Sequence, residues 1–120
     1  MITIRQQQLK ALRAASREEF VRQVAEHVRE CWPDAHASLG VAGMRQYVRA
    51  AIDRAEAYGI STQYGVVGFV DLLLALGDDF DTNDAFPWAR EILTRDVPAR
   101  EKIDTLELYA REVLGENGHA

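Results

Sequence analysis

The segment from residue 77 to residue 84, GDDFDTND, concentrates four aspartates and one asparagine. Carboxylate and amide oxygens bind hard cations, and Asp79, Asp81 and Asn83 match the first, third and fifth positions of an EF-hand calcium loop. The match then ends, because Asp84 stands where the turn needs glycine and Arg90 stands where a bidentate glutamate should bind. We therefore favour an acidic inter-helix loop whose carboxylates stabilise the positive end of the next helix. A loosely held cation is the weaker interpretation.

His27 and Cys31 lie four residues apart, so on a helix they share one face. Such a pair makes half of a four-ligand zinc site, and His36 follows closely in the sequence, but the chain has only three histidines and one cysteine to supply four ligands. However, helical spacing also places Cys31 on one apolar stripe with Phe20 and Val24. We therefore expect Cys31 to be a buried structural cysteine rather than a metal ligand or a nucleophile.

No other group of residues has the spacing of a catalytic site. The serines lie outside any Gly-x-Ser-x-Gly turn, and the glycines match no phosphate-binding loop. Asp71 is a lone carboxylate in an apolar segment, and because unpaired burial is costly it should either face solvent or pair with an arginine, for which Arg45, Arg49 and Arg54 are candidates. A general base with a raised pKa is the weaker interpretation. The sequence therefore predicts no enzyme and no cofactor.

The element that must organise these residues is the run from Gly65 to Leu76, GVVGFVDLLLAL. A helix that is apolar on nearly every face has to be surrounded by other elements, and twelve residues rise only about 18 Å, too short to cross a bilayer. We expect it to be the central helix, at about 62–77, with Ser61 or Thr62 as its N-cap. Gly65 and Gly68 predict the close approach of a neighbouring helix.

Before this helix, apolar residues recur at spacings of three and four. A short helix is expected over residues 4–13, and Ser16 with Glu19 resembles the capping box of a second helix that ends before Pro33. Residues 34–43 carry two glycines and predict a loop. A third helix then extends from about Val41 to Tyr58, where a glycine follows.

After the central helix, two prolines predict helix starts. Pro87 suits the first position of a helix capped by Asp84, and Pro98 begins the last helix, which Gly115 ends. Its apolar stripe comprises Ile103, Leu106, Ala110 and Val113. No alternation typical of strands occurs. The sequence predicts one all-α domain, residues 1–120, built as a bundle of five to six helices with a frayed tail at about 115–120.

Composition narrows the classes of partner. The chain has 120 residues and a net charge of −5. Residues 1–60 carry nine basic and seven acidic residues, giving +2, whereas residues 61–120 carry five and twelve, giving −7. Because the arginines are interleaved with glutamates, nucleic acid is disfavoured as a partner. One cysteine, no signal-peptide pattern and no long apolar span predict a cytoplasmic protein without a membrane span.

The order of several short motifs resembles that of short helical proteins encoded in bacterial type VI secretion and polymorphic-toxin gene neighbourhoods. The motifs are IRQQQLKAL, AxxYGIS, LGDDFD and PWAREIL. They cover most of the chain and include Tyr58, Gly77, Phe80 and Pro87, none of which is a catalytic signature. The resemblance implies a protein-binding role, either as an immunity protein that masks a toxin or as an adaptor or chaperone for a toxin or spike component.

These observations lead to an expected contact surface and two alternatives. We expect Asp78, Asp79, Asp81, Phe86 and Trp88 to bind a protein partner, since an acidic surface suits a basic one and aromatic side chains anchor interfaces. The first alternative is a metal-binding module or metal-dependent enzyme that uses the loop at 78–84. The second is a structural subunit that self-associates through its helix glycines, so that a homo-oligomer stays possible.

Overall fold

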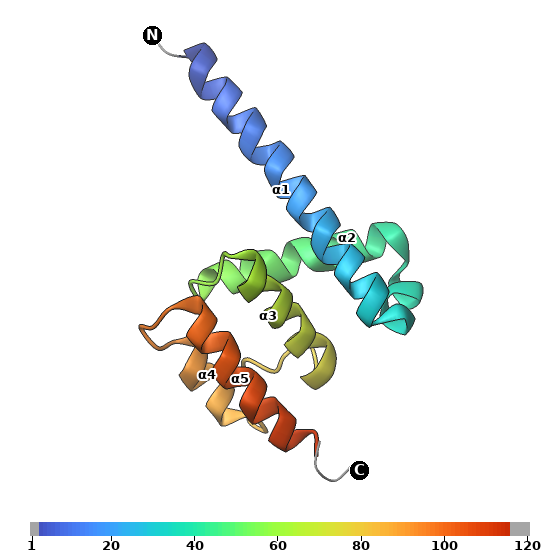
Figure 1. Ribbon diagram of the computed structural model, residues 1–120, viewed down its shortest axis with the longest axis vertical. Helices are drawn as coiled ribbons and strands as arrows, with labels where there is room; N and C mark the ends of the chain where they lie inside the picture. The colour runs from blue at the N-terminus through green and yellow to red at the C-terminus, as the bar shows by residue number, and fades with distance from the viewer. Residues whose placement is uncertain (1–2, 116–120) are drawn as a thin grey trace. The chain divides into compact units, whose positions relative to one another are not determined.

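Residues that favour helices make up most of the chain. In the part of the chain that the structure describes, every regular element is a helix and there is no strand. The computed structural model describes the backbone of residues 3–115 and the side chains of residues 16–115. Five helices follow one another over that range: α1 (Thr3–Cys31), α2 (Pro33–Ala57), α3 (Gln63–Leu76), α4 (Pro87–Leu93) and α5 (Ala99–Val113) (Figure 1). The all-α class and the number of helices are therefore confirmed.

Internal packing divides the chain into two compact units, Met1–Arg49 and Ala50–Ala120. The boundary falls within α2. The single domain proposed from the sequence stays a prediction. Of the predicted tail, Gly115 ends α5 with a φ of +70°, and residues 116–120 lie outside the described residues.

The first unit begins with one long helix where the sequence predicted two. Ser16 lies within α1 and starts no helix, because the residues around it are good helix formers with no glycine or proline among them. The end of α1 at Cys31, before Pro33, is confirmed. The loop predicted at 34–43 is wrong: α2 starts at Pro33, and only Gly40 (φ 77°) departs from helical geometry.

Buried side chains of this unit come from both of its helices. They are Val21, Val24, Ala25 and Val28 of α1 and Met44 and Val48 of α2. On the surface, the Arg49 guanidinium donates hydrogen bonds to the Glu18 carboxylate, with 2.9 Å between Nη2 and Oε1. This contact lowers the pKa of Glu18. Arg49, a candidate partner of Asp71 in the sequence, thus forms an ion pair with Glu18 of its own unit.

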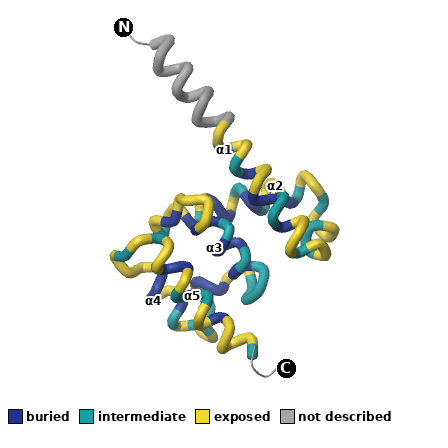
Figure 2. The backbone as a smooth tube through the Cα atoms, in the orientation of Figure 1, coloured by how far each residue is buried: buried dark blue, intermediate teal, exposed yellow. Residues whose placement is uncertain are grey.

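The second unit is organised around α3, as the sequence predicted. Thr62 caps the helix by accepting a hydrogen bond from the backbone N–H of Gly65 at 3.1 Å. Figure 2 shows buried residues along most of α3, and seven of its residues are buried. Helix α5 packs against both α3 and α4 (Figure 1).

The two glycines of α3 allow these close contacts. A Cβ added at Gly68 would lie 2.5 Å from Cγ2 of Ile103 in α5, and one added at Gly65 would lie 2.6 Å from Cγ2 of Ile60. The predicted close approach of a neighbouring helix is confirmed at Gly68. Because both glycines are covered by side chains of the same chain, they offer no surface for self-association.

Candidate interaction surface

The loop between α3 and α4 is folded into consecutive turns. Gly77 ends α3 with a φ of +116°, a conformation that favours glycine. Three backbone hydrogen bonds follow: Phe80 N–H to Gly77 O, Thr82 N–H to Asp79 O and Phe86 N–H to Asn83 O. Phe80 is buried and its ring lies 5.5 Å from that of Phe69 in α3. The loop is therefore anchored to the core at its centre.

Asp81, which the sequence assigned to the contact surface, is instead an internal structural residue. It is only 5% exposed. Its Oδ1 accepts a hydrogen bond from Arg54 Nη2 at 2.6 Å, and its Oδ2 accepts one from the Tyr58 hydroxyl at 2.7 Å. Burial and the hydrogen bond to Asp81 raise the pKa of Tyr58. With both oxygens engaged inside the unit, Asp81 is removed from the proposed surface.

Lys102 extends this internal polar network. It is buried, at 6% exposure, and its Nζ donates to the backbone carbonyl oxygen of Tyr58 at 2.6 Å. The C-terminal end of α2, the loop and α5 are thus joined through polar contacts beneath the surface. Sequence reasoning missed Lys102 entirely and proposed Arg54 for Asp71, because a partner 27 or 44 positions away leaves no local pattern.

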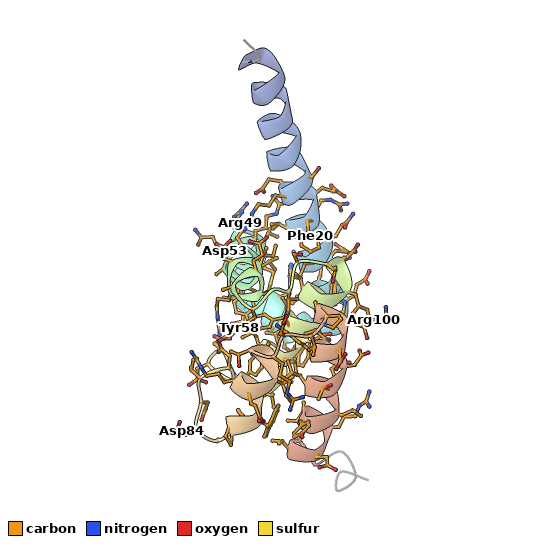
Figure 3. All side chains as sticks on the ribbon, turned by 90° about the vertical axis from the view of Figure 1, so that its left-hand side faces the viewer. Phe20, Arg49, Asp53, Tyr58, Asp84 and Arg100 are labelled. Atoms are coloured by element: carbon orange, nitrogen blue, oxygen red, sulfur yellow. The ribbon has the colours of Figure 1, made fainter. Side chains whose placement is uncertain are left out.

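The remaining aspartates of the loop are exposed. Asp78, Asp79 and Asp84 all lie on the surface, and Figure 3 shows Asp84 at the outer edge of the loop. Asp84 is not the N-cap of α4 as predicted, since Phe86 takes that position without a side-chain hydrogen bond. Instead, Asn83 Oδ1 accepts a hydrogen bond from the Ala85 N–H at 2.9 Å. We call Asp78, Asp79 and Asp84 the acidic loop.

The same geometry bears on the cation proposed for Asp79, Asp81 and Asn83. Within residues 16–115, no group of three or more histidine, cysteine, aspartate or glutamate side chains could hold a metal ion. Asp81 uses its two oxygens for Arg54 and Tyr58, and Asp79 Oδ1 lies 3.5 Å from Asn83 Nδ2. The loop is held by protein contacts, so its geometry gives the cation no support.

An aromatic cluster directly follows the acidic loop. The ring centroids of Phe86 and Trp88 are 5.7 Å apart, and those of Trp88 and Tyr109 of α5 are 5.1 Å apart. Phe86 and Trp88 are half-buried, whereas Tyr109 is 43% exposed. Val113, one turn beyond Tyr109, was predicted to be in the core but is 47% exposed. We call Phe86, Trp88 and Tyr109 the aromatic cluster.

Tyr109 is the part of this cluster that sequence reasoning missed. It lies three residues after Leu106 and four before Val113, so the apolar face of α5 is wider than the predicted stripe. The wide apolar face of α5 is the sequence feature from which Tyr109 could have been predicted. The structure adds what the sequence lacked, namely that α4 packs against α5 and brings Trp88 to this face.

Of two further candidate residues, Cys31 lies elsewhere than predicted, whereas the arginine partner of Asp71 stays a prediction. Cys31 is exposed and not buried, because the buried stripe of α1 runs through Val21, Val24 and Val28. Asp71 is half-buried. Arg54, another candidate partner of Asp71 in the sequence, forms its ion pair with Asp81.

Comparisons with known proteins add no assignment: no family model matches the chain, and no curated protein or solved structure is similar to it at a significant level. Among the described residues, no helix has both the length and the apolar character needed to cross a membrane.

Proposed function

We propose that the chain is a non-enzymatic protein-interaction module. In this proposal it acts in the bacterial cytoplasm as an immunity or adaptor protein associated with type VI secretion, and it binds a toxin or a spike component. The motif order described above supports the gene context. The observation that carries the binding role is the aromatic cluster, part-exposed at the surface and directly preceded in the chain by the acidic loop.

The chemistry of this surface defines the partner. Half-buried aromatic side chains such as Phe86 and Trp88 lose little conformational entropy on binding and often provide most of the binding energy. Three exposed carboxylates in the acidic loop favour a basic partner surface through electrostatic complementarity. The proposed partner therefore presents an apolar pocket bordered by lysine or arginine, as the basic substrate groove of a toxin would.

The internal polar network is compatible with this role. Within the described residues, every buried side-chain nitrogen and oxygen has a hydrogen-bond partner. Arg54, Asp81 and Lys102 are thus used to hold the loop and α5 in place. The acidic loop and the aromatic cluster, by contrast, lie at least partly at the surface.

The test is a tagged capture from the native host followed by reconstitution with the purified partner. Wild type is compared with the double variant Asp78→Lys, Asp79→Lys. The matched control is Asp96→Lys, Glu101→Lys, which makes the same charge change at two exposed carboxylates outside the loop. We expect one toxin-like or spike protein in stoichiometric amount with wild type and control, and much less with the loop variant at unchanged melting temperature.

Co-expression with the captured protein then separates the two roles. Restored growth of cells that produce a captured toxin identifies an immunity protein. Unchanged toxicity, combined with loss of toxin export when the gene is deleted, identifies an adaptor. The proposal is wrong if no stoichiometric partner is captured, or if the captured partner binds the loop variant and wild type equally well.

A further inference from the structure

The two compact units carry net charges of opposite sign. Residues 1–49 contain eight basic and five acidic residues, giving +3, whereas residues 50–120 contain six and fourteen, giving −8. The contrast is sharpest in two segments. Residues 3–17 of α1 contain four basic residues and no acidic one, and residues 77–84 contain four aspartates and no basic residue. We call residues 3–17 the basic segment.

The basic segment continues α1 beyond the ion pair that joins α1 to α2. That ion pair links Glu18 to Arg49, the last residue of the first unit, and the basic segment lies on the N-terminal side of Glu18. The segment includes the apolar residues Ile4, Leu9 and Leu12. Helices in proteins owe most of their stability to the packing of an apolar face against other elements. We therefore expect another surface to cover this part of α1.

The composition of the basic segment complements the acidic loop and the aromatic cluster. Spacings of three and four place Lys10, Arg13 and Arg17 on one face of a helix, and Leu9 and Leu12 adjoin them in the sequence. The acidic loop offers three exposed carboxylates, and the aromatic cluster that follows it offers part-exposed rings. Opposite charges steer and orient association, and aromatic rings provide apolar contact area. The segment and the surface thus match in both charge and polarity.

We propose that the basic segment of one copy of the chain binds the acidic loop and aromatic cluster of a second copy. The contact joins two different surfaces, so each copy keeps one of them unused and further copies can add head to tail. A helix of this length extends about 22 Å, and one face of it covers less than the roughly 800 Å² per partner of a stable complex. The association is therefore weak and needs a high protein concentration.

This contact uses the surface that the proposed function assigns to a toxin or spike component. A second copy therefore competes with that partner, and self-association regulates access to the surface. Only this regulatory consequence rests on the proposed function. Self-association is measured with the purified chain alone, so its failure leaves the capture experiment untouched, and a failed capture leaves self-association standing.

The test is analytical ultracentrifugation of the purified full chain over a range of concentrations, at low and at high salt. The segment variant is Lys10→Gln with Arg13→Gln, and the loop variant is Asp78→Asn with Asp79→Asn. We expect the average mass of wild type to rise with concentration at low salt and to fall at high salt, because salt screens the charges. Each variant alone should associate about tenfold more weakly than wild type.

A mixture of the two variants gives the sharpest comparison. The loop variant keeps its basic segment, and the segment variant keeps its acidic loop, so one intact contact remains between them. The mixture should therefore form a 1:1 dimer that does not grow further, whereas wild type continues to add copies. Recovery of association in the mixture also shows that both variants are folded.

Matched controls remove the same charges at exposed positions outside both surfaces. They are Arg45→Gln with Arg95→Gln for the segment variant and Asp96→Asn with Glu101→Gln for the loop variant. Both controls should associate like wild type, because net charge alone does not form the contact.

Wild type that stays monomeric at every concentration and salt overturns the inference. A mixture of the two variants that stays monomeric while wild type associates overturns it as well. Vesicles of phosphatidylglycerol test the other occupant that a basic helix suits. Binding of monomeric wild type to these vesicles, without self-association, would assign the basic segment to a membrane surface and contradict the contact between copies.

Discussion

Asp81 carries a charge that the surrounding residues must compensate. Its carboxylate is buried and touches a guanidinium on one oxygen and a hydroxyl on the other. Burying a charge is costly unless it is paired and hydrogen-bonded, and removing one partner leaves the other uncompensated. Arg54 is partly exposed, at 37%, so water screens this pair more than it would a fully buried one.

Asp81→Ala should therefore lower the free energy of unfolding by about 2 kcal/mol. Asp79→Ala removes the same group two residues away from an exposed position, and it should change the free energy by about 0.5 kcal/mol or less. Chemical denaturation of both variants checks the contrast. Equal losses would contradict the structural role of Asp81.

Glu107 gives a second prediction, which concerns pH. Burial raises the pKa of Glu107 above its ordinary 4.5, and the carboxylates of Asp104 and Asp71 raise it further, whereas Arg111 opposes them. The folded chain thus binds this proton more tightly than the unfolded chain does. Consequently, the contribution of Glu107 to the free energy of unfolding falls as pH rises from 4.5 through the higher folded pKa.

Glu107→Gln should raise the melting temperature at neutral pH and change it little at pH values below 4.5, where the carboxyl is protonated in both states. The gain is about a few tenths of a kcal/mol, because the side chain is largely solvated. Thermal unfolding across this pH range measures it. Glu112→Gln, an exposed carboxylate on the same helix, is the control, and a gain as large and as pH-dependent there would remove the special role of Glu107.

Residues governed by local rules were predictable from the sequence. Thr62 as an N-cap and Pro87 at a helix start each depend on neighbours within four positions. The role of Asp81 depends on Arg54, 27 positions earlier, so composition alone made it resemble its exposed neighbours. Cys31 was misplaced because the buried stripe of α1 keeps Val24 and Val28 of the predicted stripe but has Val21 in place of Phe20 and does not extend to Cys31.

At the scale of elements, the close packing of α3 depends on its glycines, because they have no side chain and leave space for neighbouring side chains. Alanine favours a helix over glycine by about 1 kcal/mol, so a glycine that persists in a buried helix needs a packing reason. At Gly68 that reason is Ile103, whose Cγ2 would lie 2.5 Å from an added Cβ. Both residues are buried, so the Ile103 side chain cannot turn away into solvent to make room for an added Cβ.

Gly68→Ala should therefore destabilise the chain by about 1–3 kcal/mol, since the overpacking outweighs the gain in helix propensity. Gly43→Ala in α2 is the matched control, because an added Cβ there meets only Leu39, whose Cβ lies at 3.4 Å. It should be neutral or stabilising by up to about 1 kcal/mol. Chemical denaturation compares the two. A stabilised Gly68→Ala variant would contradict the observed helix contact.

The sequence predicted the existence of the elements better than their boundaries. The prediction of α3 follows from a continuous apolar run, which no other element shares. The break predicted near Ser16 and the loop predicted at 34–43 both relied on weak capping and glycine signals within segments that otherwise favour helix. Gly40 does interrupt α2, with a φ of 77°. The interruption is a kink at one residue and not the ten-residue loop that was predicted.

For the whole molecule, the all-α class follows from the absence of the apolar–polar alternation that is typical of strands. The composition of the proposed interaction surface depends on how the helices pack. Sequence analysis named Phe86 and Trp88 but had no means to place Tyr109 beside them. The charge distribution was accessible from the start, because residues 61–120 carry five basic and twelve acidic residues. That excess is one reason for proposing a basic partner, since complementary charges steer association.

Charged residues should affect mainly the association rate constant of partner binding, whereas aromatic residues should affect mainly the dissociation rate constant. Surface charges act at a distance, so Asp78→Asn with Asp79→Asn should slow association by about tenfold or less and reduce its dependence on salt. An aromatic anchor acts in the bound state, so Trp88→Ala should mainly speed dissociation, by about 30-fold for a side chain worth 2 kcal/mol. Surface plasmon resonance with the captured partner at two ionic strengths separates the effects.

Leu108→Ala provides the control for this experiment. Leu108 belongs to α5 and is 58% exposed, more than Tyr109, yet it is outside the aromatic cluster. Its loss should leave both rate constants within about twofold of wild type, because a scattered exposed leucine contributes little to a specific interface. If Leu108→Ala and Trp88→Ala speed dissociation equally, partner contact is not centred on Trp88. Salt-independent association of wild type would likewise show that the acidic loop does not guide the partner.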